Sequence, residues 1–172
     1  MQRSRWTAPI ALIVFVAAAT VAVGGQLITP LAAFESLAGT SWIGRFTSSP
    51  APPFDHKIKW TVILDGQVVR WTKQVEALAF SMETFFYWDK DLDAIAFMQL
   101  GSNGIHSKGV VELDNEAIAL VGVAMQTWGT AEFKQTFEVM ADGTLEDRYY
   151  SRSETGWSPE HVIVYRMSPA EE

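Results

Sequence analysis

Apolar and polar residues alternate along most of the chain between Thr40 and Met167. Successive side chains of a β-strand point to opposite faces, so this period of two predicts strands with one buried face. No segment in this range keeps a helical period, and the pattern therefore predicts an all-β domain. The alternating segments, about ten in all, are residues 40–47, 56–64, 67–75, 81–88, 94–100, 105–113, 117–124, 132–140, 145–152 and 161–167.

The connections between these segments are short and rich in turn residues. Asp65–Gly66, Gly101–Gly104 and Ala141–Thr144 are examples, in which glycine allows a positive φ and aspartate or asparagine bonds its own backbone. Consecutive strands joined by tight turns form an antiparallel meander, which hides its edges by closing on itself. We therefore expect an up-and-down antiparallel barrel of eight to ten strands within a domain at residues 29–172. A sandwich of two sheets is the alternative.

The first 28 residues have the character of a targeting segment. Arg3 and Arg5 precede the apolar run APIALIVFVAAATVAVGG. The length of this run lies between that of a signal-peptide core and that of a spanning helix. We expect an N-terminal apolar helix over residues 1–28, either cleaved as a signal peptide or kept as a membrane anchor. The barrel domain would then be extracytoplasmic: secreted, periplasmic or anchored.

Charge and composition exclude several classes of function. The 172 residues carry a formal net charge of −7, which opposes the neutralisation of phosphates that nucleic-acid binding needs. The chain has no cysteine, so disulfides and thiolate metal sites are excluded. It also lacks the motifs of serine hydrolases, zinc hydrolases and phosphate-binding loops. The sequence predicts no catalytic residue and no metal site, and it predicts membrane contact only through the N-terminal segment.

Many large aromatic residues share the apolar face of the predicted strands. Small barrels either fill their interior with such side chains or enclose one small ligand. One hypothesis is therefore a cavity for a small apolar or amphipathic molecule, and the other is a filled core with a structural or interaction role. Thr84, Gln99 and Asp147 are polar residues expected on the same face. The candidate ligand-binding residues are Trp60, Trp71, Phe86, Trp88, Phe97, Gln135, Phe137, Tyr149 and His161.

His161 is the sharpest single candidate among the polar residues. It begins the last predicted strand and shares a face with Ile163 and Tyr165. A neutral imidazole in this place could act as a base or ligate a metal or haem iron. The alternative is a solvated, hydrogen-bonded histidine at the rim of the barrel.

The start and end of the domain resemble the calycin group, which comprises lipocalins, fatty-acid-binding proteins and lipocalin-like relatives. The resemblance consists of a predicted short helix from Pro30 to Gly39, Trp42 on the first strand, and Arg166 on the last. It implies that Gly39, Trp42 and Arg166 close one end of the barrel, with the arginine lying across the tryptophan. Two residues separate Gly39 from Trp42 where lipocalins have one, which points away from a true lipocalin.

Two narrower resemblances concern the later strands. The segments FFYWDKDLDAIAFMQLGSNG, FEVMADGTLEDRYYSR and HVIVYRM are similar to lipocalin-like domains of exported bacterial proteins, a similarity that implies no cofactor. A weaker similarity to nitrobindins implies haem binding, with His161 as the axial ligand.

Overall fold

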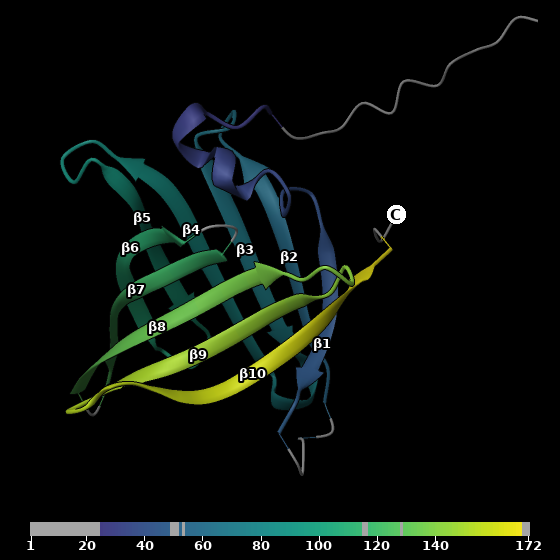
Figure 1. Ribbon diagram of the computed structural model, residues 1–172, viewed down its shortest axis with the longest axis vertical. Helices are drawn as coiled ribbons and strands as arrows, with labels where there is room; N and C mark the ends of the chain where they lie inside the picture. Colours follow the sequence, from purple (N-terminus) through teal and green to yellow (C-terminus); the bar gives the residue numbers. More distant parts are fainter. Residues whose placement is uncertain (1–24, 49–51, 53, 115–116, 128, 170–172) are drawn as a thin grey trace, which may run out of the picture.

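The computed structural model describes residues 25–48, 52, 54–114, 117–127 and 129–169, and these form one closed barrel (Figure 1). Each of its ten strands pairs antiparallel with its neighbours in sequence, and the first strand pairs with the last. The expected meander barrel is confirmed, and the sandwich is wrong. The elements are η1 (Thr29–Phe34), β1 (Ser41–Phe46), β2 (His56–Ile63), β3 (Val68–Val75), η2 (Glu76–Leu78), β4 (Phe80–Asp89), β5 (Ala94–Gly101), β6 (His106–Asp114), β7 (Ala117–Gln126), β8 (Gly129–Val139), β9 (Leu145–Ser153) and β10 (Gly156–Ser168).

The barrel closes where β1 lies beside β10. In this register Gly44 pairs with Tyr165 and Trp42 with Met167. A Cβ atom at Gly44 would lie 2.6 Å from Cγ of Tyr165, which is far inside van der Waals contact. Glycine is therefore required at this position because the tyrosine ring lies against the backbone of β1. The bare backbone of Gly44 thus gives Tyr165 its place in the interior.

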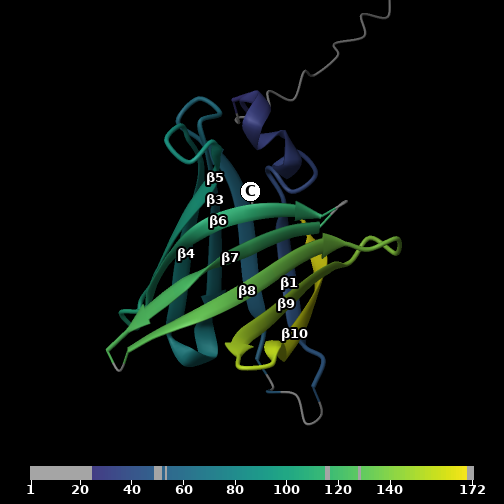
Figure 2. The same cartoon turned by 60° about the vertical axis from the view of Figure 1, so that its left-hand side comes forward.

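The segment before β1 covers one end of the barrel, which we call the plug end (Figure 2). It begins with the 3-10 helix η1 and continues through turns to Gly39, whose φ of +79° suits glycine. Leu31, Phe34 and Leu37 of this segment are buried. The ring centroid of Phe34 lies 4.8 Å from that of Phe86. The expected helix up to Gly39 is thus a shorter 3-10 helix followed by turns, held down by its apolar side chains.

The predicted leader falls largely outside the described residues, so the helix expected over residues 1–28 stays a prediction. Of the part of the chain that the structure describes, no helix has the length and apolar character needed to cross a membrane.

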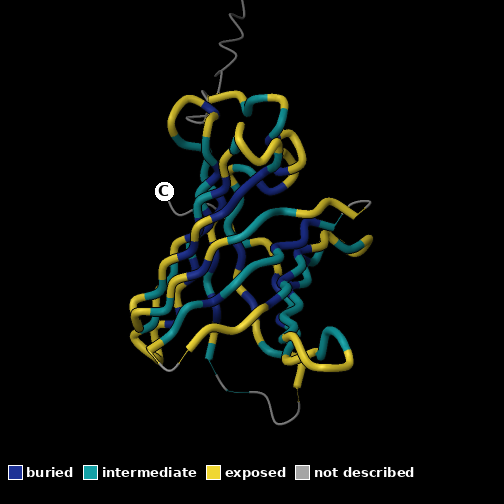
Figure 3. Tube along the Cα trace, turned by 90° about the vertical axis from the view of Figure 1, so that its left-hand side faces the viewer, coloured by how far each residue is buried: buried dark blue, intermediate teal, exposed yellow. Residues whose placement is uncertain are grey.

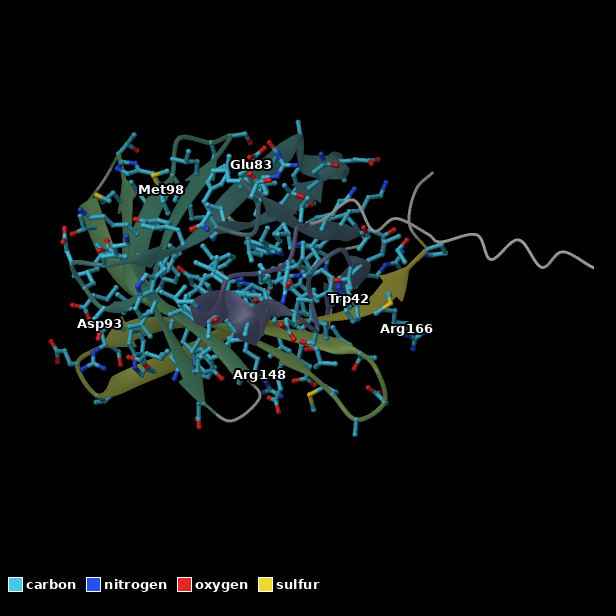
Figure 4. All side chains as sticks on the ribbon, turned by 90° about the horizontal axis from the view of Figure 1, so that it is seen from above. Trp42, Glu83, Asp93, Met98, Arg148 and Arg166 are labelled. Carbon is cyan, nitrogen blue, oxygen red and sulfur yellow. The ribbon has the colours of Figure 1, made fainter. Side chains whose placement is uncertain are left out.

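Trp42 is fixed by Thr40 and not by the arginine that the calycin resemblance implies. Its Nε1 donates to Oγ1 of Thr40 over 2.7 Å, and that hydroxyl donates to the carbonyl of Leu37 over 2.5 Å. Arg166 pairs with Ile43 in the wall and is exposed, pointing outward in Figure 4. Because Arg166 alternates with the buried Tyr165, its side chain lies on the outer face and does not cross Trp42. Thr40, one of the two residues between Gly39 and Trp42, supplies a hydroxyl to the indole instead.

We predict that Thr40→Val lowers the free energy of unfolding by about 1–2 kcal/mol, since it leaves the indole N–H of Trp42 without its acceptor. Urea unfolding followed by tryptophan fluorescence measures this change. Ser41→Ala is the matched control, because the indole N–H of Trp42 donates to Thr40 and not to the neighbouring hydroxyl. Equal effects of the two substitutions would contradict the role assigned to Thr40.

Burial alternates along the strands, and the aromatic face is the inner one (Figure 3). Trp60 and Trp71 face each other across β2 and β3, and the ring of Phe137 lies 5.2 Å from each. Gly109 and Gly122 pair across β6 and β7, where they leave room for the ring of Phe97. Viewed from the plug end, side chains fill the interior behind η1 (Figure 4). The plug half of the barrel is therefore a packed aromatic core.

Candidate functional site

Several polar side chains are buried inside the barrel, as the alternation predicts. Two of them form a hydrogen-bonded pair, in which Gln99 Nε2 donates to Oγ1 of Thr84 over 3.1 Å. Gln135 Nε2 donates to Oδ1 of Asp147 over 2.7 Å. Buried polar atoms need such partners, since an unpaired group costs about 1–3 kcal/mol. Both pairs join neighbouring strands.

A buried ion pair lies beside the second of these hydrogen bonds. Lys73 Nζ of β3 is 3.8 Å from Oδ2 of Asp147 on β9, and the side chains are 9% and 0% exposed. The hydroxyl of Tyr165 also donates to Oδ2, over 3.5 Å. The carboxylate thus has contacts from three different strands, with Gln135 on its other oxygen.

Lys73 is the main site residue that the sequence interpretation missed. It lies between Trp71 and Val75 on the inward face of β3, two residues from each. The signal was therefore present: strict alternation places this lysine inside. A charged residue is almost never fully buried unless it is paired, so this position also implied a buried acid such as Asp147.

Burial shifts the pKa of both titratable side chains that contact Asp147. Desolvation lowers the pKa of the Lys73 ammonium, while the negative charge of Asp147 opposes that change. Desolvation likewise raises the pKa of the Tyr165 hydroxyl well above its usual value, and Asp147 adds to this. Groups with shifted pKa values that converge inside a concave fold are candidates for a functional site.

A line of contacting rings runs from the packed core toward the barrel end opposite η1, which we call the distal end. Phe133 stacks on Tyr149 at 5.5 Å, and Tyr149 stacks on His161 at 5.3 Å with an angle of 5° between the ring planes. His161 and His56 both meet the ring of Phe46 edge-on, at 5.1 Å and 4.7 Å. Tyr149 and His161 are only half-buried, so this line of rings reaches solvent in the distal half.

His56 is buried with both ring nitrogens unpartnered. Only 4% of the residue is exposed, and neither Nδ1 nor Nε2 makes a hydrogen bond. Desolvation, followed by the positive charge of Lys73 and then by His161, lowers the pKa of its imidazole to about 4. In the sequence this histidine directly follows a loop, which gives no sign of its burial. Its place on the inner face of β2 makes it the least satisfied polar group of the distal half.

We call Lys73, Asp147, Gln135, Tyr165, His56 and His161 the interior polar cluster. The charge of Lys73 lowers the pKa of both histidines, which places all three residues within electrostatic reach of one another. Burial is the largest cause of the lowered pKa of His161, and Asp147 partly opposes it. The cluster therefore combines one buried ion pair with two imidazoles whose pKa values are lowered.

The lowered pKa of His56 predicts that the free energy of unfolding decreases as the pH is lowered. In the unfolded chain the imidazole takes up a proton near its ordinary pKa of 6.5, whereas the folded protein takes it up only near 4. The stabilisation is present above pH 6.5 and is lost as the pH falls toward 4. Linkage between protonation and folding gives a loss of about 1–2 kcal/mol in the free energy of unfolding between pH 7 and pH 5. This window lies above the pH range in which most carboxylates titrate.

Urea unfolding at a series of pH values checks this expectation. His56→Gln should remove most of the slope in this window, whereas His106→Gln, at an exposed position on β6, should keep it. A slope that survives in His56→Gln would show that the titrating group lies elsewhere.

Haem binding through His161 stays a prediction. The neutral imidazole suits an axial ligand, but the rings of Tyr149 and Phe46 lie on two sides of it, and a porphyrin would have to displace one of them. Within the described ranges, no three histidine, aspartate or glutamate side chains are grouped so as to hold a metal ion. A Soret band after haem titration, lost in His161→Ala, is the test.

The predicted ligand-binding residues all face the interior, in two groups. Trp60, Trp71, Phe86, Phe97 and Phe137 are fully buried in the packed core, and the indole N–H groups of Trp60 and Trp71 have no partner. The second group lies at the polar cluster and its edge, and it consists of Gln135, Tyr149 and His161. Trp88 is half-buried and packs against the core.

Comparison with protein-family models and with curated proteins finds no match for this chain. The closed, antiparallel, up-and-down barrel is consistent with a calycin, lipocalin-like fold.

Proposed function

We propose that this domain binds a small amphipathic molecule in the distal half of the barrel. The ligand's polar group meets the interior polar cluster, and its apolar part lies against the ring line of Phe133 and Tyr149. Export of the domain, which we propose from Arg3, Arg5 and the apolar run that follows, would make this an extracytoplasmic carrier or receptor. The binding function itself does not depend on the compartment.

The observation that carries the proposal is the set of buried polar atoms without partners. Among the described side chains of the distal half, both ring nitrogens of His56 are of this kind. Buried groups of this kind occur where water or a bound molecule supplies the missing hydrogen bond. Aromatic walls with a few unpaired polar groups are also the usual composition of a small-molecule site.

Access is better at the distal half than at the plug end. Phe34 closes the plug end against Phe86 and Trp60. Tyr149 and His161, in contrast, are half-buried on neighbouring strands. A groove of about 610 Å³ lies between the plug and the ends of β6, β7 and β8, but none of the cluster residues lines it. The proposed site is therefore reached past the two stacked rings.

The test is binding of N-phenyl-naphthylamine to the purified full chain, followed by dye fluorescence and by native mass spectrometry. We expect a saturable complex of one dye per barrel. Tyr149→Leu should weaken binding about three- to tenfold, the value of one aromatic contact. Tyr150→Leu is the matched control, because the adjacent side chain lies on the other face of β9.

Two results would contradict the proposal. One is a protein that neither carries a molecule on purification nor takes up the dye. The other is equal weakening by Tyr149→Leu and Tyr150→Leu. Either result would favour the alternative of a filled core with a structural or interaction role.

A further inference from the structure

Lys73 is unusual among the described lysines because its ammonium is inside the barrel. It is 7% exposed, whereas Lys59 of β2 and Lys108 of β6 are exposed on the outer face. Its Nζ is 6.0 Å from the centre of the Trp71 ring and 3.8 Å from one carboxylate oxygen. An amine held in apolar surroundings is more easily deprotonated than one in water, and it is then a nucleophile.

Asp147 is placed to exchange a proton with that amine. Gln135 and Tyr165 each donate a hydrogen bond to it, so the carboxylate is held in place from two other strands. The carboxylate is fully buried, and the charge that it faces is Lys73. An acid fixed beside an amine can take its proton and later return it.

We propose that Lys73 binds aldehydes covalently, as a protonated imine with Asp147 as its counter-ion. This inference rests on the binding function proposed above and names the chemical class of its ligand: a small molecule with an aromatic or apolar body and a carbonyl group. The ring line of Phe133 and Tyr149 receives the body, and the carbonyl carbon meets Nζ.

The reaction balances without any further reactant. Asp147 takes one proton from the ammonium, and the free amine adds to the carbonyl carbon to form the C–N bond. The resulting carbinolamine loses its oxygen as water, with protons returned through Asp147. The aldehyde and the lysine ammonium thus become an iminium ion and water, with one positive charge on each side. Asp147 faces a cation before and after the reaction and is itself neutral while it holds the proton, so no unpaired charge is left buried at any stage.

The test is reductive trapping on the full chain with naphthaldehyde and sodium cyanoborohydride, followed by proteolysis and mass spectrometry. We expect a single adduct at Lys73, at least about tenfold above that on Lys59 or Lys108, because of these three amines only that of Lys73 has an acid fixed beside it to move the proton. Lys73→Arg should abolish the adduct, because the guanidinium keeps the charge beside Asp147 but is not nucleophilic. If Lys73→Arg fails to fold, the position of the adduct in the unchanged protein decides the question.

A second probe separates this inference from the binding function. Naphthylmethanol has the same ring system without a carbonyl, and native mass spectrometry reports its non-covalent complex. A complex with naphthylmethanol, together with labelling of Lys73 no greater than that of Lys59, overturns the imine and leaves the binding function intact. Failure of the chain to bind either naphthalene compound or N-phenyl-naphthylamine overturns both.

Discussion

Asp147→Ala should lower the free energy of unfolding by about 3–5 kcal/mol, the cost of leaving a buried charge without its partner. The substitution strands the ammonium of Lys73 inside the barrel, and it removes the acceptor of Gln135 and of the Tyr165 hydroxyl. Urea unfolding at neutral pH, followed by tryptophan fluorescence, measures the loss.

A double-mutant cycle shows whether the loss comes from the pair. Lys73→Met combined with Asp147→Leu removes both charges, so the double variant should be more stable than Asp147→Leu alone. Asp55→Ala is the surface control. It removes an exposed salt bridge with Arg45, so the unfolding midpoint should change little. Additive effects of the two interior substitutions would contradict a coupled buried pair.

Gly44→Ala should lower the free energy of unfolding by about 2–3 kcal/mol, because an added Cβ overlaps the Tyr165 ring and overpacking costs this much in a tight core. The ring can give way only by leaving its place beside β1, which would also break its hydrogen bond to Asp147. Gly44→Ala therefore disturbs both the barrel closure and the interior polar cluster.

Gly143→Ala is the matched control for this substitution. A Cβ at that turn meets open space, and its φ of +79° carries only the conformational cost of about 1 kcal/mol. Comparison of the two unfolding midpoints separates overlap from backbone strain. If Gly44→Ala cost no more than Gly143→Ala, the close contact of Tyr165 with β1 would not matter to stability.

The strands were predictable because alternation is a local property. His56, Trp60 and Trp71 lie on the inner face in the structure as the period of two requires. The closure was not fixed by any local pattern: β1 and β10 lie at opposite ends of the domain, and a meander with the same turns can also form two sheets. The position of the Arg166 side chain was not predictable either. The calycin resemblance implies that it lies across Trp42, whereas its alternation with the buried Tyr165 places it on the outer face.

The site was predictable in part for a similar reason. Gln135, Tyr149 and His161 were expected on the inner face, and they lie there. The meeting of Lys73 with Asp147 was not, because β3 and β9 are not neighbours in the barrel and their contact crosses the interior. Which of the three histidines is buried without partners depends on Phe46 and Phe54, whose rings contact His56. Alternation alone does not set these distances.

The imidazole nitrogen resonances of the full chain, recorded during titration with N-phenyl-naphthylamine, test the central claim most directly. If the molecule enters the distal half, the signals of the buried His56 and of His161 shift together and saturate at one dye per barrel, while that of the exposed His106 stays in place. Binding that leaves His56 and His161 unchanged would place the dye on the outer surface and contradict the interior site.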